Sequence, residues 1–186
     1  MCALCDEMGG LGGGVGLSDR PSHRLAGFLW KGARTEVDGG ALHPLFARVR
    51  AFSDGRESGL WRSPIVCLYF DECVDRLRCL VAAAIEPGEA VPAGMSVMDM
   101  PEMTFASIWH LPEDGAVAAH CGRIVEAIRE AGLAWDRSRL FRREEYPPDF
   151  DPSQPLSMRL MLPVAREIPA EARSGPASAS VAERNR

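Results

Sequence analysis

The chain has 186 residues, of which 46% are hydrophobic and 25% charged, and this composition is typical of one globular domain. Its net charge of −5 and pI near 5.4 argue against broad binding to nucleic acids or anionic membranes, because both need surplus Lys and Arg. The longest apolar stretches, such as residues 79–85, are far shorter than the roughly 20 residues that cross a bilayer. The N-terminus lacks the basic start and apolar run of a secretory signal, so we expect a cytoplasmic location.

Both ends of the chain are predicted to lie outside a folded core. Residues 1–22 form a flexible glycine-rich arm, since the run from Gly9 to Ser18 has neither the strand before it nor the helix after it that a phosphate loop needs. Residues 166–186 are rich in Ala, Ser, Pro and charge, which predicts a disordered tail. Cys2 and Cys5 have C-x-x-C spacing without a second matching pair, so we expect no metal and no cofactor. The folded domain is expected over residues 23–165.

The first half of this domain predicts the order strand, helix, strand, strand. Residues 24–34 (RLAGFLWKGAR) are typical of a strand. Residues 42–53 carry apolar side chains at three- and four-residue spacing, which predicts an amphipathic helix that Asp54 and Gly55 close. The β-rich runs 64–70 and 76–84 flank Asp71 and Glu72, so we expect a hairpin there.

The second half repeats this order. Residues 103–110 predict a strand, residues 117–128 predict a helix that Gly132 ends, and residues 140–146 and 157–163 predict two more strands. Residues 25–30 also align with residues 105–110, and residues 95–100 predict an additional edge strand. The predicted fold class is α+β: duplicated strand-helix-strand-strand halves form an antiparallel sheet with two helices on one face and a central ligand cleft.

Three segments of the chain carry a resemblance to a known family. They are MTFASIWHLPEDG, GRIVEAIREAGLAW and RREEYPPDFDPSQPLSMRLMLPV. They resemble the GyrI-like small-molecule-binding domain, the SOUL-like effector-binding domain of bacterial transcription activators, over most of residues 23–164. Two departures stand out: the glycine behind the histidine is delayed to Gly115, and Arg142 and Arg143 precede the Glu-x-Tyr motif in place of an aromatic residue. The preceding arm is too short for a DNA-binding helix-turn-helix, so the resemblance implies a stand-alone form without direct nucleic-acid binding.

The Glu-x-Tyr motif supplies the first candidate site residues. Glu144 and Tyr146 are two apart on a predicted strand, so their side chains share one face. The resemblance implies that this glutamate lies in the ligand cleft, where a carboxylate among aromatic residues selects cationic or hydrogen-bonding ligands. The alternative is an exposed strand charge paired with an arginine.

Aromatic residues and one histidine complete the candidate site. Trp30, Trp109 and Tyr69 fall on predicted strands, where they would form cleft walls that bind flat or cationic molecules by stacking and cation–π attraction, or would simply pack in the core. His110 ends its strand and could donate to a ligand, although a satisfied polar residue is the alternative. Trp61 and Trp135 are expected at the rim or in packing.

These features favour a protein that binds or sequesters aromatic, apolar or cationic drug-like compounds. The resemblance also implies two alternatives. One is a hydrolase that detoxifies reactive cyclopropane-containing natural products, with Glu144 and Tyr146 as its catalytic residues. The other is an inhibitor that contacts gyrase, or another protein partner such as a regulator, through an outer surface.

Overall fold

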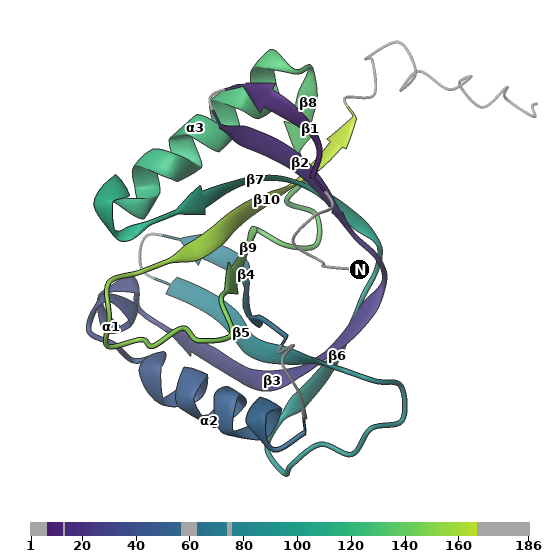
Figure 1. Cartoon of the computed structure of the whole chain (residues 1–186), viewed down its shortest axis with the longest axis vertical. Helices are drawn as coiled ribbons and strands as arrows, with labels where there is room; N and C mark the ends of the chain where they lie inside the picture. The colour runs from purple at the N-terminus through teal and green to yellow at the C-terminus, as the bar shows by residue number, and fades with distance from the viewer. Residues whose placement is uncertain (1–6, 13, 57–62, 74–75, 167–186) are drawn as a thin grey trace, which may run out of the picture.

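The computed structural model describes residues 7–12, 14–56, 63–73 and 76–166 of the chain. These residues form one ten-stranded antiparallel sheet in the order β1-β2-β7-β10-β9-β4-β5-β3-β6, with β8 beside β10 (Figure 1). The strands are β1 (Glu7–Gly12), β2 (Val15–Arg20), β3 (His23–Gly32), β4 (Ile65–Cys73), β5 (Arg76–Ile85), β6 (Ser96–Met100), β7 (Met103–His110), β8 (Leu133–Trp135), β9 (Arg142–Tyr146) and β10 (Met158–Arg166). The helices are α1 (Arg34–Asp38), α2 (His43–Asp54), α3 (Val117–Glu130) and a 3₁₀ turn at Pro112–Asp114.

The predicted duplication is confirmed by the strand pairing. In the first half β3 pairs with β5 and β5 with β4, while in the second half β7 pairs with β10 and β10 with β9. The halves meet where β4 pairs with β9, and Cys67 opposite Glu144 is the central pair of this ladder. Tyr69 and Tyr146 each lie two residues beyond that pair on their own strand, so they occupy equivalent positions about a pseudo-two-fold axis.

A second contact between the halves makes the sheet curve back on itself. β2 runs into β3 and β6 into β7 along the side away from the long helices (Figure 1). The two ladders keep a single register, from Gly16 opposite Ser107 to Gly27 opposite Ser96. Pro21 and Pro101 interrupt this ribbon at its bend, because proline has no N–H to donate to a ladder.

Helices cover one face of the sheet, and both faces are buried. Helix α2 packs on β5, β3 and β4, and α3 packs on β7, β8 and β10. Between helices and sheet lies the larger core cluster, which includes Phe46, Val49 and Ile124. A second apolar cluster on the opposite face includes Leu68 and Phe105. Because β4 and β5 are buried on both sides over most of their length, their sequences are nearly continuous apolar runs rather than alternating ones, whereas the neighbouring β9 is rich in charged residues.

Gly27 marks a place where two strands approach too closely for a side chain. A Cβ built on this residue would lie 2.0 Å from the carbonyl oxygen of Val81 on β5. That neighbour is backbone and cannot turn aside, so we expect Gly27→Ala to lower the free energy of unfolding by about 1–3 kcal/mol, the usual cost of overpacking. Urea denaturation measures this. Gly122→Ala on α3 is the control, since its Cβ would meet no atom within 4 Å and alanine favours a helix more than glycine does, so this variant should be as stable as wild type or up to about 1 kcal/mol more stable.

Some parts of the fold differ from the expectations. The glycine-rich run is not a loose arm where it is described: β1 and β2 form a hairpin, Gly14 at the turn has φ 77°, and β2 pairs with β7. This pairing uses backbone groups, so the scarcity of side chains does not prevent it. The short helix α1 and the strand β8 were not predicted. The predicted tail lies outside the described residues, apart from the end of β10.

The described helices include no segment with the length and apolar character that a membrane span requires.

Candidate ligand-binding site

A cleft of about 240 Å³ lies over the centre of the sheet, where the two halves meet. Its floor is formed by Tyr69 on β4 and by Arg142, Glu144 and Tyr146 on β9. Side chains of α1, α2, α3 and the segment between β9 and β10 form its walls. The alternation of β9 directs residues 142, 144 and 146 to the same face, so this strand brings two charged groups and a phenol into one cleft.

Glu144 is held by two neighbours from its own strand. Its Oε2 accepts a hydrogen bond of 2.6 Å from the hydroxyl of Tyr146, and its Oε1 lies 3.0 Å from Nε of Arg142. The guanidinium of Arg142 also lies over the ring of Tyr69, 4.0 Å from its centroid. Glu144 is only 3% exposed, so its charge needs these partners. The cleft therefore already contains a cation, the guanidinium of Arg142.

Aromatic rings surround this ion pair. Phe46 of α2 meets Tyr146 edge-on at 4.8 Å between centroids, and Phe150 lies 4.4 Å from Tyr146 and 5.3 Å from Phe46. The carbonyl of Phe150 accepts a hydrogen bond of 2.6 Å from Nη2 of Arg50, which attaches this connecting segment to α2. The walls are thus fixed before any ligand arrives, which reduces the ordering cost of binding.

The two equivalent tyrosines remain neutral phenols. Burial is the main cause, and together with the nearby charge of Glu144 it raises the pKa values of Tyr69 and Tyr146 well above that of an ordinary phenol. Tyr146 therefore acts as a hydrogen-bond donor toward the carboxylate, and both rings offer neutral aromatic faces to the cleft.

The structure brings three of the six predicted site residues together. Glu144, Tyr146 and Tyr69 line the cleft, whereas Trp30, Trp109 and His110 are not among its described lining residues. Trp30 borders a separate surface hollow of about 310 Å³ beside Leu29 and Met98. Trp109 is 38% exposed, and His110 is buried against α3. Trp135 donates its indole N–H to the carbonyl of Phe141, and Trp61 lies outside the described residues.

Comparison with solved structures identifies proteins of the same fold. No protein-family model matches the sequence, and a search of curated proteins found no match. Among solved structures, the C-terminal domain of EcmrR superimposes with a TM-score of 0.62 at 11% identity, over 82% of this chain and 98% of that one. SAV2435 bound to tetraphenylphosphonium gives a TM-score of 0.56 at 17% identity, over 80% and 92%. The chain therefore shares the fold of these two proteins.

Two further solved structures have the same fold. A hydrolase encoded by lin2189 from Listeria innocua superimposes with a TM-score of 0.52 at 14% identity, over 81% of this chain and 91% of that one. In the EcmrR complex with DNA the TM-score is 0.63 at 12% identity, over 82% of this chain, but this chain spans only 57% of the length of that EcmrR chain. At these identities the likeness shows the fold alone.

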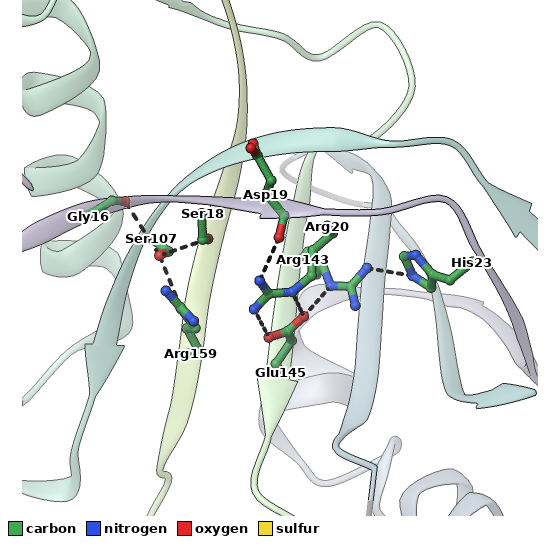
Figure 2. A network of polar contacts seen from close by, with 9 residues as sticks. All are labelled: Gly16, Ser18, Asp19, Arg20, His23, Ser107, Arg143, Glu145 and Arg159. Carbon is green, nitrogen blue, oxygen red and sulfur yellow. Dashed lines mark hydrogen bonds and ion pairs between the residues drawn. The ribbon is translucent and has the colours of Figure 1, made fainter. Parts of the chain in front are cut away.

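A second group of charged side chains lies on the opposite face of β9 (Figure 2). Glu145 receives two hydrogen bonds from Arg20, of 2.8 Å from Nε and 2.7 Å from Nη2, and one of 2.7 Å from Nε of Arg143. Arg143 also donates to Nε2 of His23 over 3.0 Å. Burial is the main cause that lowers the pKa of His23, so this ring is neutral at pH 7 and can accept that bond. This group ties β2 to β9.

Sequence reasoning missed Arg142, Phe46 and Phe150 as parts of the cleft. The arginine was noted only as a departure from the family pattern, and its contact with Glu144 could have been foreseen from their spacing of two on one strand. Phe46 fell on the predicted apolar face of its helix and gave no sign of a site. Phe150 lies in a segment rich in Pro and Asp, which carries no periodicity.

Proposed function

We propose that this protein binds flat aromatic compounds in the central cleft, and that cationic members of this class bind by displacing Arg142 from Glu144. The observation that carries the proposal is the guanidinium of Arg142, which lies against the buried carboxylate and over Tyr69. A delocalised cation on a carboxylate and an aromatic face is the arrangement that an aromatic cation would adopt. The protein's own side chain therefore marks the ligand position.

The size of the cleft limits the ligand. A volume of about 240 Å³ lies just below the range of about 300–1,000 Å³ that is usual for pockets of drug-sized molecules, which favours two fused rings over larger compounds. The tetraphenylphosphonium bound by SAV2435 supports a lipophilic cation as the ligand class. We propose that this protein acts in the cytoplasm. Its interaction with a protein partner, such as a regulator or gyrase, stays a prediction from the sequence.

The proposal is tested with a pair of probes of equal shape, the cation 1-methylquinolinium and the neutral 1-methylnaphthalene. We expect Glu144→Gln to weaken binding of the cation by about 1.5–3 kcal/mol, the value of a hydrogen bond to a charged group. The affinity for the neutral compound should change little. Isothermal titration calorimetry measures both. Equal affinity of wild type and Glu144→Gln for the cation would show that the carboxylate does not recognise it, and no saturable binding of either probe to wild type would refute the cleft as their site.

A hydrolase is the second candidate, and one contact favours it. Glu144 and the phenol of Tyr146, 2.6 Å apart, form an acid–phenol pair inside an aromatic cleft, where the carboxylate could activate water against a strained ring. The match to the Listeria innocua hydrolase is consistent with this chemistry. Incubation of a cyclopropane-containing electrophile with catalytic amounts of protein distinguishes the candidates: a ring-opened product that accumulates over many turnovers means catalysis, and saturable binding that leaves the compound unchanged means binding alone.

A further inference from the structure

Two buried histidines and an aspartate lie together where the chain passes from β7 to α3. His110 is the last residue of β7, Asp114 ends the 3₁₀ turn, and His120 lies in the first turns of α3. His110 is 2% and His120 4% exposed, while Asp114 is exposed. The ligand atoms that these three side chains offer all lie within 4.8 Å of one another. None of the three is among the described residues that line the ligand cleft.

The spacing of the two imidazoles suits a shared metal ion. Nδ1 of His110 and Nδ1 of His120 are 3.2 Å apart, and the two ring planes are at 83°. A tetrahedral Zn²⁺ with nitrogen ligands at about 2.0–2.1 Å holds two such nitrogens about 3.3–3.4 Å apart. We propose that His110, Asp114 and His120 form a binding site for a divalent transition-metal ion, for which Zn²⁺ is the ion of choice.

The carboxylate distinguishes this cluster from a simple pair of hydrogen-bonded histidines. A hydrogen bond between the rings needs no acid nearby, whereas the two nitrogens and the oxygen of Asp114 make a donor set that borderline-soft Zn²⁺ accepts. The backbone N–H of Leu111 donates to Oδ2 of Asp114 over 2.7 Å and so holds the carboxylate in place. With three protein ligands, the fourth position of a tetrahedral ion remains for water or another small ligand.

Arg123 fixes the tautomer of His120 in the metal-free protein. Its Nη1 lies 3.0 Å from Nε2 of His120, and because a guanidinium only donates, this nitrogen must accept. The proton of His120 is therefore on Nδ1, which donates to Nδ1 of His110. When both Nδ1 atoms bind the metal, the proton of His120 moves to its Nε2 and no proton is lost. The contact with Arg123 must then break, so this arginine opposes the metal through both its hydrogen bond and its charge.

This competition gives an unusual test, because one substitution should tighten the site. In Arg123→Gln the positive charge is gone, and the amide oxygen can accept the proton that Nε2 carries in the metal-bound form. We expect this variant to bind Zn²⁺ several-fold more tightly than the parent protein. Asp114→Asn removes a charged ligand from an exposed position without disturbing the core, and should weaken binding by about 10–100-fold or more. His120→Ala should weaken it further.

The experiment uses the full chain with Cys2→Ser and Cys5→Ser, since this thiol pair, outside the described residues, could bind zinc by itself. Calorimetry with Zn²⁺ should give one ion per chain, and Co²⁺ should give the visible absorption of a tetrahedral site. His43→Ala is the matched control, because His43 is exposed on α2, and it should bind as the parent does. Circular dichroism checks that His120→Ala folds, and Asp114→Asn decides the question if it does not. Absent Zn²⁺ binding, or binding that Asp114→Asn and Arg123→Gln both leave unchanged, would overturn the proposal.

Discussion

Replacing Glu145 with glutamine should lower the free energy of unfolding by about 3–5 kcal/mol, the usual cost of breaking a buried ion pair from one side. Glutamine keeps the shape of the side chain, but its amide nitrogen cannot accept the hydrogen bonds that Arg20 and Arg143 now donate. Both guanidinium groups would then be buried without this carboxylate. Because Arg20 belongs to β2 and Glu145 to β9, the loss would also weaken the attachment of the N-terminal hairpin.

Urea denaturation at pH 7 measures this loss. Glu126→Gln is the matched control: Glu126 also pairs with an arginine, Arg129 on the same helix, but both side chains are exposed. Exposed pairs contribute little, so the control should unfold with the wild-type midpoint. A Glu145→Gln protein that is as stable as the control would mean that the arginines find equivalent partners elsewhere.

The same carboxylate predicts how stability depends on pH. Burial alone would raise the pKa of Glu145, but the hydrogen bond from Arg20 and the charges of Arg143 and Arg20 outweigh it and lower the pKa from 4.5 to about 2. Because the pKa is lower in the folded state, the charge of Glu145 contributes about 3 kcal/mol to the free energy of unfolding above pH 4.5. This contribution is lost as the pH falls through about 2. The difference in free energy of unfolding between wild type and Glu145→Gln should therefore become smaller as the pH falls over this range. A difference that stays constant would mean that packing, and not charge, causes it.

The sequence predicted most strands and both long helices because their patterns are local. The helix at His43–Asp54 shows its apolar spacing within three turns, and the hairpin of β4 and β5 is adjacent in the chain. The N-terminal hairpin was missed for the opposite reason: its stability comes from pairing with β7, whose residues lie about ninety positions later. No window of the sequence around Gly9 contains that information.

The charged side chains of β9 (RREEY) also could be predicted only in part, because their partners lie far away in the sequence. Two arginines and two glutamates in a row are typical of an exposed strand, yet all five residues are buried. The alternation of the strand could be predicted, and it correctly places Glu144 and Tyr146 on one face. The partners of Arg143 and Glu145 on the other face could not be predicted, because Arg20 reaches Glu145 only after the halves assemble. Likewise, the separation of ten positions between His110 and His120 matches no metal-ligand spacing, and the structure alone brings the rings together.

Arg142 should decide whether the cleft prefers neutral or cationic ligands. In the wild-type protein a cation must first separate the guanidinium of Arg142 from the carboxylate of Glu144, 3.0 Å away. Methionine has a similar length and no charge, so Arg142→Met leaves the carboxylate available to the ligand while keeping much of the contact with Tyr69. The cost is a buried charge with one partner fewer, so the free protein should unfold at a lower temperature.

We expect Arg142→Met to bind 1-methylquinolinium about 10–150-fold more tightly than wild type, which corresponds to roughly 1.5–3 kcal/mol for a newly available charged hydrogen-bonding partner. The affinity for 1-methylnaphthalene should change much less, because it makes no use of the charge. In the double variant Arg142→Met/Glu144→Gln both charges are gone, so the gain for the cation should vanish and part of the lost stability should return. Calorimetry of the four proteins with both probes gives the coupling energy between the two residues directly.

Arg48→Met is the control for a general effect of removing an arginine. Arg48 is exposed on α2 and lies over Phe28, 3.7 Å from its centroid, away from the described lining of the cleft. Its loss should leave both affinities unchanged. If Arg142→Met binds the cation no more tightly than wild type, the guanidinium does not occupy the ligand position. Because the neutral probe reports on the cleft without its charge, unchanged binding of 1-methylnaphthalene in that case would leave the cleft as the binding site and remove only the competition between Arg142 and the ligand.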